Sequence, residues 1–164
     1  MVELLFNKNL YIAVLAAGKG TRMNSDIPKV MFEINKKPML HYVIKTAKKL
    51  NPQQIYIIVG YKKDVVMKEF NNSNVEFIIQ KNQKGTAHAI MQGKEQMKKL
   101  IGNLLILSGD VPLITSTTLK NFIKKHNKTK AIASIITTSI KNPKGYGRII
   151  RDQHNKISMI IEHK

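Results

Sequence analysis

The sequence predicts an open, mostly parallel α/β sheet with helices on both faces. Short, continuously apolar runs such as 10–16 (LYIAVLA) and 103–110 (NLLILSGD) are typical of strands that are buried on both faces. Segments with apolar residues at helical spacing lie between these runs. Alternation of this kind favours a parallel sheet, in which ligands bind outside the carboxyl ends of the strands. We therefore expect functional residues just after the apolar runs.

The expected strands are short apolar runs that end near glycine or polar residues. They are expected at 10–16, 30–34, 55–60, 75–80, 103–110 and 131–140. Residues 145–150 and 156–162 are expected to form a late antiparallel pair.

The expected helices occupy 38–50, 64–70, 86–100 and 116–126. Pro38 suits the first turn of its helix, and the apolar residues that follow recur at helical spacing. Ser116 and the threonines after it provide the cap chemistry of a helix N-terminus.

Length and composition indicate one domain spanning 1–164. The chain has 164 residues, of which 43% are hydrophobic, enough for a substantial core. It contains no cysteine, which excludes disulfides and thiolate metal sites. The amino-terminal stretch is a poor signal peptide, and no apolar run approaches the length that spans a membrane. We therefore expect a cytoplasmic protein with no membrane partner.

The net charge of +18 raises the hypothesis of nucleic-acid binding. Lysines are spread along the whole chain, whereas arginine occurs only at 22, 148 and 151. Arginine is the better residue for bidentate phosphate and base contacts, and the ten phenylalanines and tyrosines do not interleave with basic residues. The pattern favours solvated surface lysine over nucleic-acid binding, with an acidic partner as the alternative.

The connection 15–30 (LAAGKGTRMNSDIPKV) concentrates glycines and basic residues after the first expected strand. Its spacing fits neither a Walker loop nor a dinucleotide fingerprint. Small residues at 16–18 and at Gly20 allow a backbone to approach a base or a phosphate. Arg22 and Lys29 add positive charge that suits a polyphosphate. The alternative is a glycine-rich turn with solvated basic residues.

This connection resembles the signature of the sugar-nucleotide nucleotidyltransferases (the MobA-like superfamily), LAAGxGTRM followed by PK. Further segments resemble one branch, the amino-terminal uridyltransferase domain of bifunctional N-acetylglucosamine-1-phosphate uridyltransferase/glucosamine-1-phosphate acetyltransferases. They are Gln80, GTAHA (85–89), LSGDVPL (107–113), GYGRI (145–149) and IIEHK (160–164). The resemblance runs from about Leu10 to the last residue.

The resemblance implies a Rossmann-like sheet and a Mg²⁺-dependent enzyme. Such an enzyme transfers UMP from UTP to N-acetylglucosamine 1-phosphate and releases pyrophosphate. The product, UDP-N-acetylglucosamine, is a precursor for peptidoglycan and lipopolysaccharide synthesis. No covalent nucleophile is needed, so catalysis is expected to consist of positioning and charge neutralisation.

The resemblance also implies roles for individual residues. Arg22 and Lys29 are the expected catalytic residues, meeting the pyrophosphate and the phosphate oxygens, and Asp110 is the expected Mg²⁺ ligand. Gly145 and Glu162 are expected to contact the sugar. The expected nucleotide-binding residues are Leu15, Ala16, Ala17, Gly18, Lys29, Gln80, Gly85, Thr86, Ser108 and Gly109. Ala87 departs from the family, which usually has a glycine there, and no histidine is expected to be catalytic.

The family's uridyltransferase domain continues beyond the EHK motif and is followed by a β-helix acetyltransferase domain. Neither part is found in 1–164, so we expect a sheet that is incomplete at the carboxyl terminus. Exposed apolar surface would then favour self-association or association with a missing carboxyl-terminal part. The chain could be a fragment or a short natural protein. The alternatives to the leading function are a non-catalytic nucleotide-binding remnant or partner module and a nucleotidyltransferase for another sugar or cofactor.

Overall fold

The computed structural model describes residues 9–20 and 25–161. The chain divides into two compact units, Met1–Thr129 and Lys130–Lys164. We call these the first and second unit and describe each by itself. The expectation of a single domain over 1–164 stays a prediction.

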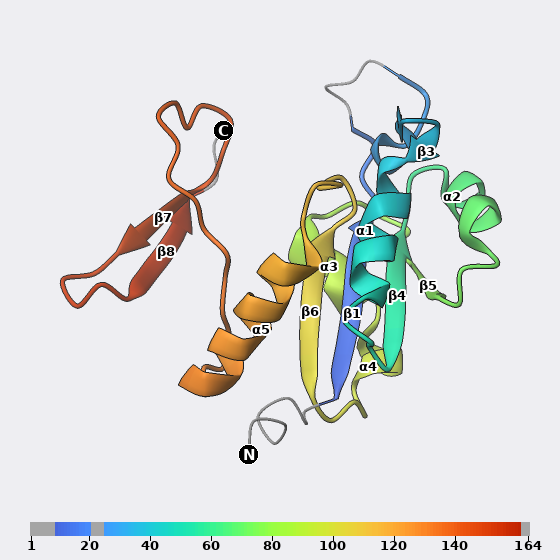
Figure 1. Cartoon of the computed structure of the whole chain (residues 1–164). Helices are drawn as coiled ribbons and strands as arrows, with labels where there is room; N and C mark the ends of the chain where they lie inside the picture. Colours follow the sequence, from blue (N-terminus) through green and yellow to red (C-terminus); the bar gives the residue numbers. More distant parts are fainter. Residues whose placement is uncertain (1–8, 21–24, 162–164) are drawn as a thin grey trace. The chain divides into compact units, whose positions relative to one another are not determined.

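The first unit contains a four-stranded parallel sheet in the order β5-β4-β1-β6 (Figure 1). Its strands are β1 (Leu10–Ala16), β4 (Gln54–Val59), β5 (Glu76–Ile79) and β6 (Asn103–Ser108). In the register, Leu15 of β1 lies opposite Ile58 of β4 on one side and Ser108 of β6 on the other. The predicted open parallel sheet is confirmed.

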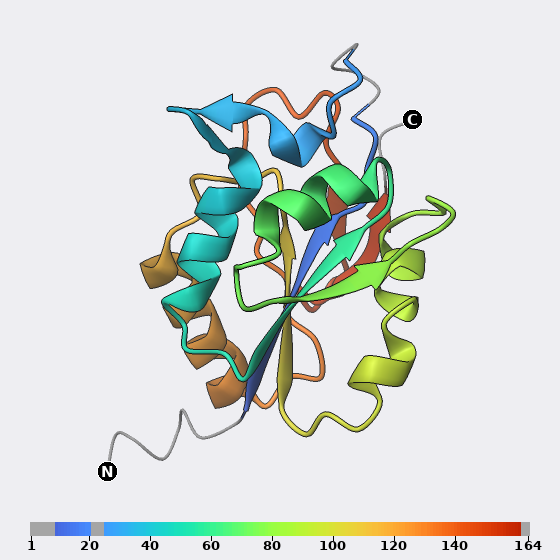
Figure 2. The ribbon, with the colours of Figure 1, turned by 90° about the vertical axis from the view of Figure 1, so that its right-hand side faces the viewer.

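Helices cover both faces of this sheet (Figure 2). Three helices pack on one face: α1 (Met39–Lys48), α2 (Lys63–Phe70) and α5 (Ser116–Thr129). Two short helices pack on the other: α3 (Thr86–Met91) and α4 (Lys94–Met97).

Strand β1 supplies side chains to the cores on both faces. Ile12 and Val14 pack with the buried side chains of α1 and α5, whereas Ala13 packs toward α3. All three are fully buried. Successive side chains of a strand point to opposite faces, so a strand covered on both sides has to be apolar at every position.

The segment between β1 and α1 departs from the expected strand at 30–34. Residues Lys29–Met31 form a 3₁₀ turn, η3, in which the amide of Met31 donates to the carbonyl of Pro28 at 2.8 Å. Only β2 (Glu33–Ile34) is extended, and it pairs with β3 (Lys37–Pro38). The two connecting residues, Asn35 and Lys36, both have positive φ, as a tight hairpin turn requires.

The expected helix over 86–100 is interrupted. Helix α3 ends at Met91 and α4 begins at Lys94. A Cβ atom on Gly93 would lie 2.6 Å from Cδ1 of Ile78 in β5, so a larger residue would have to displace the end of that side chain. Glycine also destabilises the interior of a helix, and the break between α3 and α4 includes Gly93.

The second unit contains one antiparallel pair, β7 (Arg148–Arg151) and β8 (Ile157–Ile161). The predicted late pair is confirmed, and Glu162 lies outside the described residues. The expected strand at 131–140 is wrong, since no strand is assigned there. Its isoleucines favour extended structure, but a strand also needs a neighbour to bond with, and 131–140 has no ladder partner in the described part of the chain.

Some large apolar side chains are exposed, among them Leu104 and Ile106 of β6 and Ile132 of the second unit. Within the described ranges, none of the helices has the length and hydropathy needed to cross a bilayer.

Candidate active site

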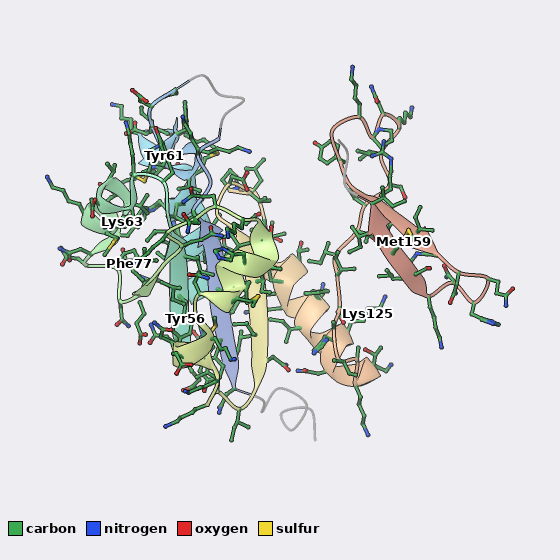
Figure 3. All side chains as sticks on the ribbon, turned by 180° about the vertical axis from the view of Figure 1, so that it is seen from behind. Tyr56, Tyr61, Lys63, Phe77, Lys125 and Met159 are labelled. Atoms are coloured by element: carbon green, nitrogen blue, oxygen red, sulfur yellow. The ribbon has the colours of Figure 1, made fainter. Side chains whose placement is uncertain are left out.

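The four parallel strands of the first unit end at one edge of the sheet, and the expected site residues follow them. Gly18 lies just beyond β1, Gln80 directly follows β5, and Asp110 lies two residues after β6. Tyr61, two residues after β4, marks this edge in Figure 3, whereas Tyr56 lies farther down the same strand. Polar groups at the carboxyl ends of neighbouring parallel strands are the usual basis of a ligand site in this architecture.

The ends of β1 and β6 are tied together by the backbone. The amide of Gly109 donates to the carbonyl of Leu15 at 2.9 Å. A Cβ atom on Gly109 would lie 2.8 Å from that carbonyl oxygen and 3.1 Å from Cγ1 of Val30. Because only glycine fits this contact, Asp110 is held beside the residues that follow the β1 loop.

Lys29 and Asp110 form an ion pair, with 2.6 Å between Nζ and Oδ2. Their side chains are 43% and 28% exposed, so both charged groups reach solvent. Lys29 is flanked by Pro28 and Val30, which are buried and fix the backbone between them. The structure thus brings together two residues that the sequence analysis singled out separately.

The loop after β1 approaches Lys29 through Gly20. This glycine has φ of +67°, and a Cβ atom on it would lie 2.7 Å from Cβ of Lys29. Gly18 has no atom within 4 Å of its Cβ direction, which leaves open space above the backbone there. The loop therefore combines a tight contact at Gly20 with an open backbone stretch at Gly18.

Tyr61 borders the same loop, although the sequence analysis did not single it out. Its amide donates to the carbonyl of Ala17 at 3.1 Å, and its hydroxyl lies 3.4 Å from Oδ1 of Asp26. The ammonium nitrogens of Lys19 and Lys62 lie 5.4 and 5.7 Å from the centre of its ring. Its place after a buried parallel strand was the signal that could have found it.

Gln80 and Gly85, two of the expected nucleotide-binding residues, lie in contact. Gln80 is 3% exposed, and its amide nitrogen donates to the carbonyl of Gly85 at 3.2 Å. Gly85 has φ of +95°, a conformation that glycine adopts readily, and Thr86 begins α3. The amide nitrogen of Gln80 also lies 3.0 Å from Nδ1 of His88, a histidine with no expected role.

Three expected site residues do not belong to the described part of the first unit. Gly145 belongs to the second unit, has φ of +83° and has nothing within 4 Å of its Cβ direction. Arg22 and Glu162 lie outside the described residues. Their expected roles stay predictions.

Asp110 could supply one carboxylate ligand to a divalent cation at this site. In the part of the chain that the structure describes, no group of three or more histidine, aspartate or glutamate side chains could hold a metal ion. Mg²⁺ is commonly bound by one or two carboxylates together with substrate phosphates and water. Asp110, partly exposed beside Lys29, fits that mode of binding.

The chain is similar to curated proteins named bifunctional protein GlmU. It is 41% identical over 154 residues to the bifunctional protein GlmU of Streptococcus uberis and to that of Streptococcus gordonii. It is also 41% identical over 154 residues to GlmU of Acholeplasma laidlawii. Each match covers 94% of this chain and 33% of the relative, so the chain spans about a third of the length of these proteins.

Two solved structures share the fold. HddC from Yersinia pseudotuberculosis, solved in complex with GMP-PN, superposes with a TM-score of 0.70 at 24% identity over 93% of this chain and 69% of that one. A UDP-glucose pyrophosphorylase complexed with UDP-glucose also gives 0.70, at 22% identity over 95% and 69%. The family model described as nucleotidyl transferase matches residues 12–163. The chain therefore belongs to the nucleotidyl transferase family.

Proposed function

We propose that this chain is a sugar-nucleotide nucleotidyltransferase that transfers UMP from UTP to N-acetylglucosamine 1-phosphate. The observation that carries the proposal is the ion pair between Lys29 and Asp110 beside the open glycine loop at the carboxyl edge of the sheet. Membership of the nucleotidyl transferase family and 41% identity to GlmU proteins support the reaction class and the choice of substrates.

The loop after β1 suits the triphosphate. Gly18 offers space for a close approach, and Lys29 offers a partly exposed ammonium group at the same edge. Lys19 and Lys62, beside Tyr61, add positive charge next to the loop. A polyanion is stabilised where several cations and backbone amides converge on it.

Asp110 is the residue that would hold Mg²⁺, with phosphate oxygens completing the coordination. The cation, when bound, would neutralise negative charge on the triphosphate. Lys29, which pairs with Asp110 in the free protein, would then be available to the phosphate oxygens.

The proposed reaction is a direct displacement. A phosphate oxygen of the sugar phosphate forms a bond to the α-phosphorus of UTP, the bond from that phosphorus to the bridging oxygen breaks, and pyrophosphate leaves. The protein contributes position and positive charge, and no side chain has to form a covalent intermediate. Lys29 would stabilise the charge that develops on the phosphate oxygens. Arg22, as the resemblance implies, would meet the departing pyrophosphate.

The test is release of pyrophosphate from UTP and N-acetylglucosamine 1-phosphate in the presence of Mg²⁺. ATP, GTP, CTP and dTTP replace UTP in parallel reactions, and glucose 1-phosphate replaces the amino sugar. We expect the highest kcat/KM for the UTP and N-acetylglucosamine 1-phosphate pair. A higher value for another pair would assign the same chemistry to another substrate.

A matched pair of variants separates the site from surface charge. Asp110→Asn removes the proposed metal ligand, whereas Asp64→Asn removes an exposed carboxylate that pairs with Lys63 at 2.9 Å on α2. We expect turnover to fall by at least tenfold in the first variant and to stay unchanged in the second. UTP binding in calorimetry without pyrophosphate release would overturn the catalytic proposal in favour of a nucleotide-binding module.

A further inference from the structure

The side chain of Gln80 is held by two groups of helix α3. Gln80 is the buried polar residue of the described part of the chain, with 3% of its surface exposed. Its amide nitrogen donates to the carbonyl of Gly85 at 3.2 Å and lies 3.0 Å from Nδ1 of His88. The two hydrogens of the amide nitrogen therefore have two neighbouring acceptor positions.

The carbonyl of Gly85 fixes which way the Gln80 amide points. A backbone carbonyl can only accept, so the atom of Gln80 that faces it is the nitrogen. The same nitrogen faces Nδ1 of His88, which has to accept as well. A neutral imidazole carries one hydrogen, and in His88 that hydrogen consequently lies on Nε2.

Gln92 lies on the other side of the imidazole. Its amide is 3.2 Å from Nε2 of His88, and its nitrogen makes a contact of 3.4 Å with the backbone carbonyl of His88. That carbonyl already accepts from the backbone amide of Gln92. The carbonyl of Gly85 likewise already accepts from the backbone amide of Ala89. Gln80 is buried and its contact with a carbonyl is the shorter one, 3.2 Å against 3.4 Å, whereas Gln92 is only partly buried. We therefore assign the turned amide, whose oxygen accepts from Nε2 of His88, to Gln92.

The oxygen of the Gln80 amide remains for a ligand. In the described ranges no hydrogen bond to this oxygen is found, and no buried side-chain nitrogen or oxygen lacks a partner. With its amide nitrogen held by Gly85 and His88, Gln80 can offer this oxygen to a ligand.

We propose that His88 is a positioning residue. Together with the carbonyl of Gly85 it holds the Gln80 amide so that the oxygen, an acceptor, is left for the base, and this orientation selects uracil over cytosine. This inference rests on the proposed function and takes Gln80, one of the expected nucleotide-binding residues, as the residue that contacts the base. N3 of uracil carries a hydrogen and can donate to the Gln80 oxygen. N3 of cytosine has a lone pair in that place, and two acceptors facing each other repel.

The test compares affinities for UTP and CTP in calorimetry with Mg²⁺ present. We expect the native protein to prefer UTP. His88→Phe removes one of the two acceptors that hold the amide nitrogen of Gln80, so the amide turns more readily, and the preference should fall by up to roughly tenfold. His88→Asn can offer an amide oxygen close to the position of Nδ1 and should keep most of the preference. His41→Phe, a histidine of α1 on the other face of the sheet, should keep all of it.

The ratio of affinities separates positioning from loss of structure. A merely structural role for His88 would weaken both nucleotides equally and leave the ratio unchanged, which would overturn the inference. A second measurement uses the native protein alone and determines which nitrogen of His88 carries the hydrogen. Nitrogen-15 chemical shifts should place the His88 hydrogen on Nε2, and the Nδ1–H tautomer would contradict the proposal.

The outcomes also distinguish this inference from the proposed function. If the native protein and the His88→Phe variant prefer UTP to the same degree, the proposed role of His88 is wrong and the proposed function is unaffected. A native protein that binds both nucleotides equally would remove the basis for selection by Gln80. A native protein that binds no nucleotide would overturn the proposed function, and the inference with it.

Discussion

The ammonium nitrogen of Lys29 lies 2.6 Å from Oδ2 of Asp110, although the two residues are far apart in the sequence. The first follows the loop of β1 and the second follows β6. These strands are parallel neighbours, and the amide of Gly109 joins them at the edge. Since both side chains reach solvent, the pair contributes little to stability, and its charges remain available to a ligand.

Replacing either partner of this pair should affect ligand binding far more than folding. For Lys29→Ala and Asp110→Ala we expect thermal stability within about 1 kcal/mol of the native protein, as for other exposed ion pairs. Affinity for UTP with Mg²⁺ should fall by roughly tenfold or more, because hydrogen bonds to charged groups are lost. Thermal melts and calorimetry measure the two effects. A large loss of stability with unchanged affinity would show that the pair is structural.

The glycines at 109 and 18 should respond in opposite ways to alanine. Gly109→Ala places a Cβ atom 2.8 Å from the backbone carbonyl of Leu15, so we expect a loss of about 1–3 kcal/mol in the free energy of unfolding. Gly18→Ala meets no atom within 4 Å and should leave stability unchanged. If the backbone at Gly18 approaches the nucleotide, the same change should weaken UTP binding. Urea denaturation and calorimetry check both variants, and equal stabilities would contradict the packing argument.

The parallel topology was predictable because its determinants are local. Strands covered on both faces have to be apolar throughout, and 10–16 has that pattern. Residues 104–107 are also apolar, although Leu104 and Ile106 on one face of β6 are exposed. Once the strands are parallel neighbours, the residues that follow them meet at one edge. The proximity of the β1 loop and Asp110 therefore follows from the order of elements.

Other features depend on contacts that a one-dimensional pattern does not contain. Residues 131–140 have the composition of a strand, yet a strand needs a bonded neighbour. The expected helix at 86–100 is interrupted next to Gly93, which lies close to the side chain of Ile78. His88 has no metal-ligand spacing, and its relation to Gln80 becomes visible only when α3 packs beside β5.

Leu119 should be essential for the attachment of α5 to the sheet. Its side chain is fully buried in the core on the face that α1 also covers. Leu119→Ala should lower the free energy of unfolding by about 2–5 kcal/mol, the usual cost of a buried leucine. Leu113→Ala is the matched control, because Leu113 is 85% exposed, and it should change stability by less than about 0.5 kcal/mol. Urea titration of both variants measures the difference. Equal effects would mean that α5 does not depend on this contact.

Tyr56 should make the stability of the first unit fall at alkaline pH. Burial raises the pKa of Tyr56 above its ordinary value of 10.0, and the charge of Glu76, its neighbour in the register, adds to the rise, as does Tyr11. The folded state therefore favours the neutral phenol. Below pH 10 Tyr56 is protonated in the folded and in the unfolded protein, and its full contribution to the free energy of unfolding is present. Above pH 10 Tyr56 ionises first in the unfolded chain, so the free energy of unfolding falls as pH rises.

The variant Tyr56→Phe isolates this effect. The melting temperature of the native protein minus that of Tyr56→Phe should be constant between pH 7 and about 9 and should decrease above pH 10, because only the native protein loses the contribution of the phenol. Tyr146→Phe, which removes a tyrosine that is 63% exposed, is the control variant for the loss of a phenol hydroxyl. The titration of lysines is common to all three proteins and cancels. Parallel curves for the native protein and Tyr56→Phe would show that the phenol of Tyr56 ionises equally in both states.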